Sequence, residues 1–162
     1  MSQAENTLNV SSTSADWRGV ALSNFQLSPF SLDGVLFASI EGFIQGVKFP
    51  EGDPRRERAF VLSGWDAKNL GSQADRSGAY WQGRQFAYGS PEHHQLIERA
   101  IRARIAQNAG LAQTLASTDG ANLIHVTNEP ESPTTSLPAV VFCRILNQMR
   151  DELLADGKVR ST

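Results

Sequence analysis

Three polar residues in the segment IEGFIQGVKF, residues 40–49, have a spacing that could form a ligand site. Glu41, Gln45 and Lys48 follow one another at i, i+4 and i+7, which places them on one face of an α-helix. A carboxylate, an amide and an ammonium that point the same way can bind a polar ligand. The alternative is a solvated helix face that carries one pair of opposite charges.

Two glycines lie within the same helical segment. Gly42 and Gly46 are four residues apart, and each costs an interior helix position about 1 kcal/mol relative to alanine. Such a cost is compensated when another backbone or a ligand approaches closely. We therefore predict a ligand pocket along the face of Glu41, although packing of a second helix on the glycines would explain them equally well.

The surrounding sequence predicts the elements that position this face. Asp33 and Gly34 favour a two-residue hairpin turn, and Ser39 can cap the helix that follows. Apolar periodicity and turn residues predict helices over residues 40–48, 53–64, 90–108, 109–117 and 137–155, the last capped by Ser136, and a strand over 122–127 that could pair with the hairpin. Residues 65–89 read as a long connection with short helical pieces.

This order of elements predicts an α+β fold, predominantly helical, with a small β-hairpin or sheet near the N-terminus. We expect residues 1–14 to form a flexible polar tail or a loose first strand, and residues 15–162 to form a single compact domain. The expected inner stripe of the first long helix is Ile40, Phe43, Ile44 and Val47.

Composition excludes several classes of protein. The 162 residues are 40% hydrophobic with a net charge of −2, which argues against a protein that grips nucleic acid by charge alone. No apolar run approaches the length of a membrane span, and no secretory signal is recognisable, so we expect a cytoplasmic protein. Phosphate-loop, dinucleotide-binding, zinc-protease and serine-hydrolase motifs are absent from the sequence.

The histidines and the single cysteine have ordinary structural interpretations. His93 and His94 start a helix and point about 100° apart, so we expect them to be solvated and not to share an ion. His125 lies in the predicted strand and reads as a hydrogen-bonded structural histidine. Cys143 lies in an apolar helical run and reads as a small buried residue.

The segment LSNFQLSPFSLDGVLFASIEGFIQGVKF, residues 22–49, resembles the opening motif of the NADAR family. That motif joins a Ser-Asn-Phe, a hairpin with Asp-Gly and a helix that carries Glu, Gln and Lys in fixed order. The matching residues are Ser23, Asn24, Phe25, Asp33, Gly34, Ser39, Glu41, Phe43, Gln45, Lys48 and Phe49. Weaker likeness continues through AKNLG, the segment 97–127 and the last helix.

The resemblance implies an N-glycosidase that acts on a ribosylated or ADP-ribosylated base, such as an early riboflavin intermediate or ADP-ribosylated guanine. It implies Glu41 as the carboxylate that stabilises the sugar cation and orients water, with no metal or redox cofactor. The expected partner is a nucleotide or ADP-ribose-like small molecule; nucleic acid would be contacted only through a modified base, and the oligomeric state is open. The expected substrate-binding residues are Asn24, Phe25, Gly42, Gln45, Lys48 and Trp65, with Tyr80 or Trp81 as further aromatics that could stack on a base.

One segment departs from the family pattern. Where relatives carry an Asp followed by Trp-Gly and a glycine-rich stretch, this chain has NEPESPTTSLPAVVF, residues 128–142. Glu129 or Glu131 is the expected replacement for the missing Asp at the Glu41 pocket. The alternatives are a non-catalytic nucleotide-binding or ADP-ribose-binding module of the same fold and, less favoured, an interaction protein whose helix faces meet a partner chain.

Overall fold

The computed structural model of the protein describes residues 6–157, which fold into two compact units. The first unit comprises residues 6–23, 105–130 and 138–157, and the second comprises residues 24–104 and 131–137. Helices account for 45% and strands for 12% of the described residues, which confirms the predicted α+β, predominantly helical class.

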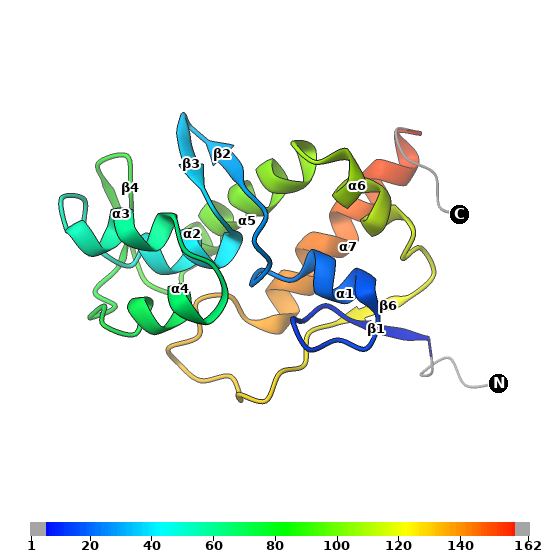
Figure 1. Ribbon diagram of the computed structural model, residues 1–162, viewed down its shortest axis with the longest axis horizontal. Helices are drawn as coiled ribbons and strands as arrows, with labels where there is room; N and C mark the ends of the chain where they lie inside the picture. Colours follow the sequence, from blue (N-terminus) through cyan, green and yellow to red (C-terminus); the bar gives the residue numbers. More distant parts are fainter. Residues whose placement is uncertain (1–5, 158–162) are drawn as a thin grey trace. The chain divides into compact units, whose positions relative to one another are not determined.

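Seven helices lie within the described residues (Figure 1). They are α1 (Trp17–Leu22), α2 (Ile40–Gly46), α3 (Pro54–Phe60), α4 (Gly64–Gly71), α5 (Pro91–Ala106), α6 (Ala109–Ala116) and α7 (Ala139–Ala155). Five of them were predicted, with ends that differ by a few residues. The regular helix α4 was expected only as part of a long connection. The N-cap residue of α7 is Pro138, which makes no side-chain capping hydrogen bond, and not the predicted Ser136.

Within the described part of the chain, six short strands form three two-stranded sheets. They are β1 (Thr7–Asn9), β2 (Phe30–Leu32), β3 (Val35–Phe37), β4 (Ala79–Trp81), β5 (Arg84–Phe86) and β6 (Asn122–Ile124). The predicted hairpin is confirmed: β2 and β3 pair antiparallel across Asp33 and Gly34, whose φ angles of 51° and 82° suit a two-residue turn. The β4–β5 hairpin was not predicted.

The predicted partner of β6 was wrong. This strand pairs in parallel with β1, so that Thr7, Leu8 and Asn9 oppose Asn122, Leu123 and Ile124. Of the two readings of residues 1–14, a strand is therefore observed at Thr7–Asn9, while residues 1–5 of the predicted tail lie outside the described residues. A single domain over residues 15–162 stays a prediction.

In the second unit, α2 packs against α3 and α4 (Figure 1). Its predicted apolar stripe is confirmed, because Ile40, Phe43, Ile44 and Val47 are all buried. Ser39 caps the helix as expected, with its side-chain oxygen accepting a hydrogen bond from Gly42 N–H. The core around the stripe is aromatic: Phe37, Phe43, Phe60 and Trp81 contact one another edge to face or at a tilt.

The packing of α3 corrects the explanation of the two glycines in α2. A Cβ atom at Gly42 would lie 2.6 Å from the carbonyl oxygens of Ala59 and Leu62, and one at Gly46 would collide with the Phe60 ring. Both glycines therefore allow α3 to approach closely. The inference from these glycines to a ligand was wrong, and we do not retain Gly42 as a substrate-binding residue.

Candidate functional site

The polar row of α2 is buried. Glu41, Gln45 and Lys48 expose 8%, 5% and 5% of their surface, respectively. A solvated face with one charge pair is thereby excluded. Because burying charged groups is costly unless they are paired or used, this row is the strongest candidate site in the second unit.

The Glu41 carboxylate is fixed by its neighbour one turn along the helix. Gln45 Nε2 donates a hydrogen bond of 2.5 Å to Glu41 Oε2. The backbone of Glu41 is held as well, because its N–H donates to the carbonyl oxygen of Asn24 at 3.0 Å. Two residues of the predicted substrate-binding set, Asn24 and Gln45, thus contact Glu41 directly, one through the backbone and one through the side chain.

Lys48 is a buried cation, and its side-chain ammonium has no hydrogen bond or close ion pair among the described residues. Burial lowers the pKa of its ammonium group to about 8; the Glu41 carboxylate acts in the opposite direction, and the positive charges of Arg76 and Lys68 lower it further. A ligand anion beside Lys48 would compensate this buried charge.

Three cations and one carboxylate gather in this region, since Lys48 is influenced by Glu41, Arg76 and Lys68. Their formal charges sum to about +2 at neutral pH. Arg76 has a left-handed backbone conformation, with φ at 57°, and its buried Nε atom has no hydrogen-bond partner in the described part of the chain. A cluster with this excess of positive charge favours an anionic ligand.

An aromatic pair lies beside Lys68. Its ammonium is 5.9 Å from the centre of the Phe25 ring and 5.3 Å from the Trp65 ring, and the two rings contact edge to face at 5.3 Å. Trp65 is 55% exposed, so its ring is open to a ligand. By contrast, Trp81 is a core residue whose Nε1 donates to Asp33, and Tyr80 pairs with Ser77.

The prediction that His93 is solvated was wrong. Its side chain is fully buried at the start of α5, and Nδ1 accepts a hydrogen bond from Gly89 N–H, which places the proton of the neutral ring on Nε2. Burial lowers the pKa of the imidazole to about 4, with smaller contributions from the charges of His94 and Lys48. Nε2 has no hydrogen-bond partner among the described residues.

The segment that departs from the family pattern is anchored in part within the second unit. The Tyr88 hydroxyl donates to the carbonyl oxygen of Thr134 and lies 2.7 Å from Ser136 Oγ, while its ring packs against His93 at 5.1 Å. Glu129 belongs to the first unit and Glu131 to the second, and both are exposed. Their role at the Glu41 site stays a prediction.

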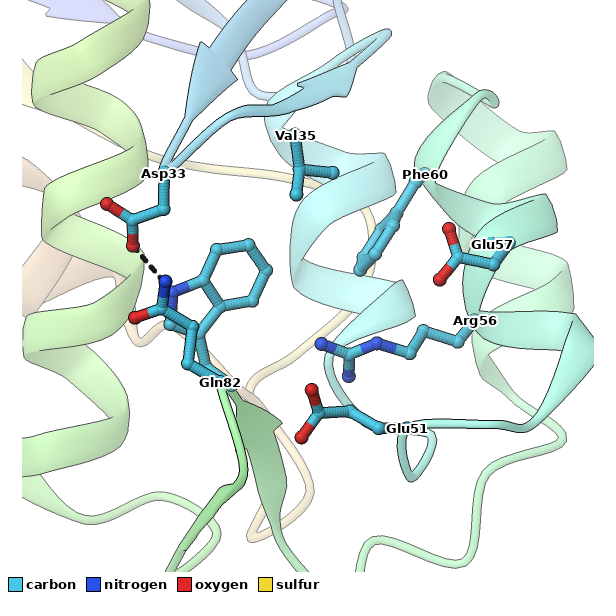
Figure 2. Close-up of a pocket in the computed structure, with 8 residues that line it drawn as sticks. Asp33, Val35, Glu51, Arg56, Glu57, Phe60 and Gln82 are labelled. Atoms are coloured by element: carbon cyan, nitrogen blue, oxygen red, sulfur yellow. Dashed lines mark hydrogen bonds between the residues drawn. The ribbon is translucent and has the colours of Figure 1, made fainter.

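A separate pocket of about 190 Å³ lies in the same unit between α3 and the β4–β5 hairpin. Its lining residues are Asp33, Val35, Glu51, Arg56, Glu57, Phe60, Trp81 and Gln82. Figure 2 shows the Arg56 guanidinium pointing into it between Glu51 and Phe60. Arg56 Nη1 donates to the carbonyl oxygens of Phe49 and Tyr80 at 3.0 and 2.9 Å, so this buried cation is bonded to the backbone.

His125 behaves as predicted. His125 Nδ1 lies 2.7 Å from the Val10 carbonyl oxygen, and its ring contacts Phe142 edge to face, so it is a hydrogen-bonded structural residue of the first unit. No group of three or more His, Cys, Asp or Glu side chains among residues 6–157 could hold a metal ion. Within the same span, each helix is too short or too polar to cross a membrane.

Comparison with known proteins defines the class. The structure superposes on the NMR structure of the E. coli protein YbiA with a TM-score of 0.65 and 22% sequence identity, over 86% of this chain and 80% of that one. This likeness shows the fold, and the resemblance to the NADAR family seen in the sequence is confirmed as a NADAR fold.

The sequence relatives are phage proteins. The chain is 34% identical over 142 residues to the "Uncharacterized 17.1 kDa protein in Gp30-rIII intergenic region" of Enterobacteria phage T4, covering 85% of this chain and 93% of that protein. The family described as bacteriophage protein GP30.3 matches residues 16–151, and the chain belongs to this family.

Proposed function

We propose that the protein is an N-glycosidase, which hydrolyses the bond between a ribose and a base in a ribosylated or ADP-ribosylated substrate. The observation that carries the proposal is the buried Glu41 beside Lys48, whose ammonium has no hydrogen bond or close ion pair among the described residues, in a chain with the NADAR fold. A carboxylate and an uncompensated cation are the two charges that such a substrate needs, one for the sugar and one for its phosphate.

Glu41 is the proposed catalytic carboxylate. When the C1′–N bond breaks, its electron pair leaves with the base, and positive charge develops on C1′ and the ring oxygen. A fixed carboxylate near these atoms stabilises the transition state more than the ground state. The same group can accept a proton from the water that attacks C1′, and transfer of this proton to the departing base gives the free base and the ribose hydroxyl as products.

The other residues of the site bind the substrate in this proposal. Lys48, assisted by Lys68 and Arg76, neutralises phosphate oxygens, and their net positive charge with Glu41 matches a doubly charged anion. Phe25 and Trp65 provide the face on which a base can stack, because Trp65 is exposed and Lys68 lies against both rings. The resemblance to the NADAR family implies no metal or redox cofactor for this reaction.

The test is the substitution Glu41→Gln, which keeps the shape and removes the charge. Release of free base from ADP-ribosylated guanosine and from riboflavin-pathway intermediates is measured by chromatography. We expect kcat to fall about 100-fold or more, with Tm and ADP-ribose affinity nearly unchanged. An unchanged kcat would remove Glu41 from the catalytic role and leave Glu129 and Glu131 as candidates.

The alternative is a binding module of the same fold. The replaced segment 128–142 favours it, since the glycine-rich wall of the relatives is missing here. A thermal-shift screen with ADP-ribose, nucleotides and ribose phosphates separates the two: binding of ADP-ribose by a wild-type chain that releases no base from any of these substrates would establish the module.

A further inference from the structure

Gly71, the last residue of α4, has no local conformational reason to be glycine. Its φ is negative, and it is buried, so any small residue would suit the backbone. A glycine at a helical position costs about 1 kcal/mol relative to alanine, which calls for a compensating close contact. That contact is with Gln45 of α2: a Cβ at Gly71 would collide with the amide Oε1 and lie 2.7 Å from Gln45 Cβ.

The Gln45 amide is held between two groups. Its Nε2 donates to Glu41, while Oε1 faces the Cα of Gly71 and has no conventional hydrogen-bond partner among residues 6–157. The reversed amide would set Oε1 against the carboxylate, and two acceptors at that distance repel. The hydrogen that Gly71 carries in place of Cβ points toward Oε1, which is a weak but suitable contact. The orientation of Gln45 is therefore determined from both sides.

We propose that Gly71 and Gln45 are positioning residues for Glu41. Gly71 leaves the space in which the Gln45 amide lies, and the amide in turn fixes the carboxylate one helical turn away. Gln45 then acts through Glu41, in place of the direct contact with the substrate that was expected from the sequence. The inference rests on the proposed function for its kinetic consequence, while the geometry itself is independent of the reaction.

The geometric part of the proposal, that Gly71 leaves the space for the Gln45 amide, is tested by NMR on the whole protein. The side-chain amide signals of Gln45, assigned by their loss in Gln45→Met, should differ from those of free glutamine because Nε2 donates to a carboxylate. Gly71→Ala should move these signals toward the free values. The control is Gly110→Ala in α6, where a Cβ would meet only Asn108 Oδ1, at 3.3 Å. Gln45 signals that stay in place in Gly71→Ala would overturn the proposal.

The kinetic part uses Gln45→Met, which keeps the length of the side chain and removes its donor. We expect kcat to fall about 100-fold with KM little changed, because a displaced catalytic group loses transition-state contact and not binding. The double variant with Gly71→Ala should lose no more kcat than the worse single variant, since both act through one hydrogen bond. Wild-type kcat in Gln45→Met would contradict the inference even if Gly71→Ala fails to fold.

The two proposals fail in different ways. If the wild-type protein releases no base from any substrate, the proposed N-glycosidase activity is refuted, and the Gln45 amide signals in Gly71→Ala still decide the geometry. If base is released and Glu41→Gln is inactive, but Gln45→Met is fully active, the proposed function stands and the positioning role is refuted.

Discussion

Two buried cations in the second unit differ in the contacts that their charged groups make. Arg56 in α3 and Lys48 just after α2 expose 4% and 5% of their surface. Arg56 donates two hydrogen bonds to backbone carbonyl oxygens and lies over the rings of Phe60 and Trp81, 5.1 and 5.8 Å from their centres. Lys48 has neither kind of contact among the described residues.

This difference distinguishes a cation with a structural role, Arg56, from a cation that is available to bind a ligand, Lys48. The guanidinium of Arg56 joins α3 to Phe49, in the segment after α2, and to β4, so its desolvation is compensated within the protein. Lys48 is desolvated without such compensation, which is why its pKa falls to about 8. Proteins retain such destabilising groups chiefly where function requires them. Exchanging each cation for an apolar side chain should therefore have opposite consequences.

The largest effect is expected for Arg56→Met. It removes both donors to the carbonyl oxygens and two cation–aromatic contacts, so the free energy of unfolding should fall by about 3 kcal/mol or more. Urea denaturation followed by circular dichroism measures it. The exposed Arg58→Met on the same helix is the control and should change stability by about 0.5 kcal/mol or less. Equal losses in the two variants would show that Arg56 is not the structural cation described here.

Lys48→Met should separate stability from binding. At pH 7, the depressed pKa of Lys48 corresponds to a cost of up to about 3 kcal/mol, so its removal should leave the free energy of unfolding unchanged or raised. Its affinity for ADP-ribose, measured by calorimetry, should fall about 30- to 100-fold with the loss of a charge-assisted hydrogen bond. Arg58→Met again serves as control. Loss of stability with unchanged affinity would reverse the assignment of the two cations.

The free energy of unfolding should also decrease in acid, because His93 is buried in its neutral form. The pKa of His93 is about 4 in the folded protein and lies near 6.5 when unfolded, so the unfolded chain binds the proton first as the pH falls. The associated stability is fully present above pH 6.5 and is lost between pH 6.5 and 4, about 2 kcal/mol of it by pH 5.

The measurement is the difference in free energy of unfolding between wild type and His93→Gln from pH 7 to pH 4. Taking the difference removes the contribution of carboxylates that titrate in the same range. A difference that does not change with pH would contradict the buried neutral imidazole. Arg56 cannot contribute to this dependence, because a guanidinium does not titrate there even with its pKa lowered by burial.

The sequence was sufficient for elements with strong local signals. Asp33-Gly34, the Ser39 cap and the apolar stripe of α2 each depend on neighbours in the chain, and all three were predicted correctly. The pairing of β6 with β1 was not predicted, because strands of only three residues carry no signal for a partner more than 100 positions away in the sequence.

The glycines near the candidate site show the same limit of prediction from local sequence. The rule that a helical glycine marks a close approach was sound, but the sequence does not say what approaches. At Gly42 and Gly46 it is α3, while at Gly71 it is the side chain of Gln45, which holds Glu41. The burial of His93 was missed because the ring of Tyr88 packs against it, and the Tyr88 hydroxyl is held by Thr134 and Ser136, more than 40 positions away, which no local pattern records.

The smallest expected effect concerns the exposed edge of the site, where Trp65 lies beside Phe25 and Lys68. Stacking of a base on an open indole contributes about 1 kcal/mol or somewhat more, so Trp65→Ala should weaken ADP-ribose binding about 5- to 10-fold. Because the ring is 55% exposed, stability should change little. Trp17→Ala, at a tryptophan that is 67% exposed in the first unit, is the matched control and should leave affinity unchanged.

Ribose 5-phosphate sharpens the test of Trp65, since this ligand keeps the sugar and the phosphate but has no base. Trp65→Ala should leave its affinity as in wild type, whereas Lys48→Met should weaken it as strongly as it weakens ADP-ribose. An equal loss for both ligands in Trp65→Ala would mean that the indole supports the phosphate side of the site and that the base lies elsewhere.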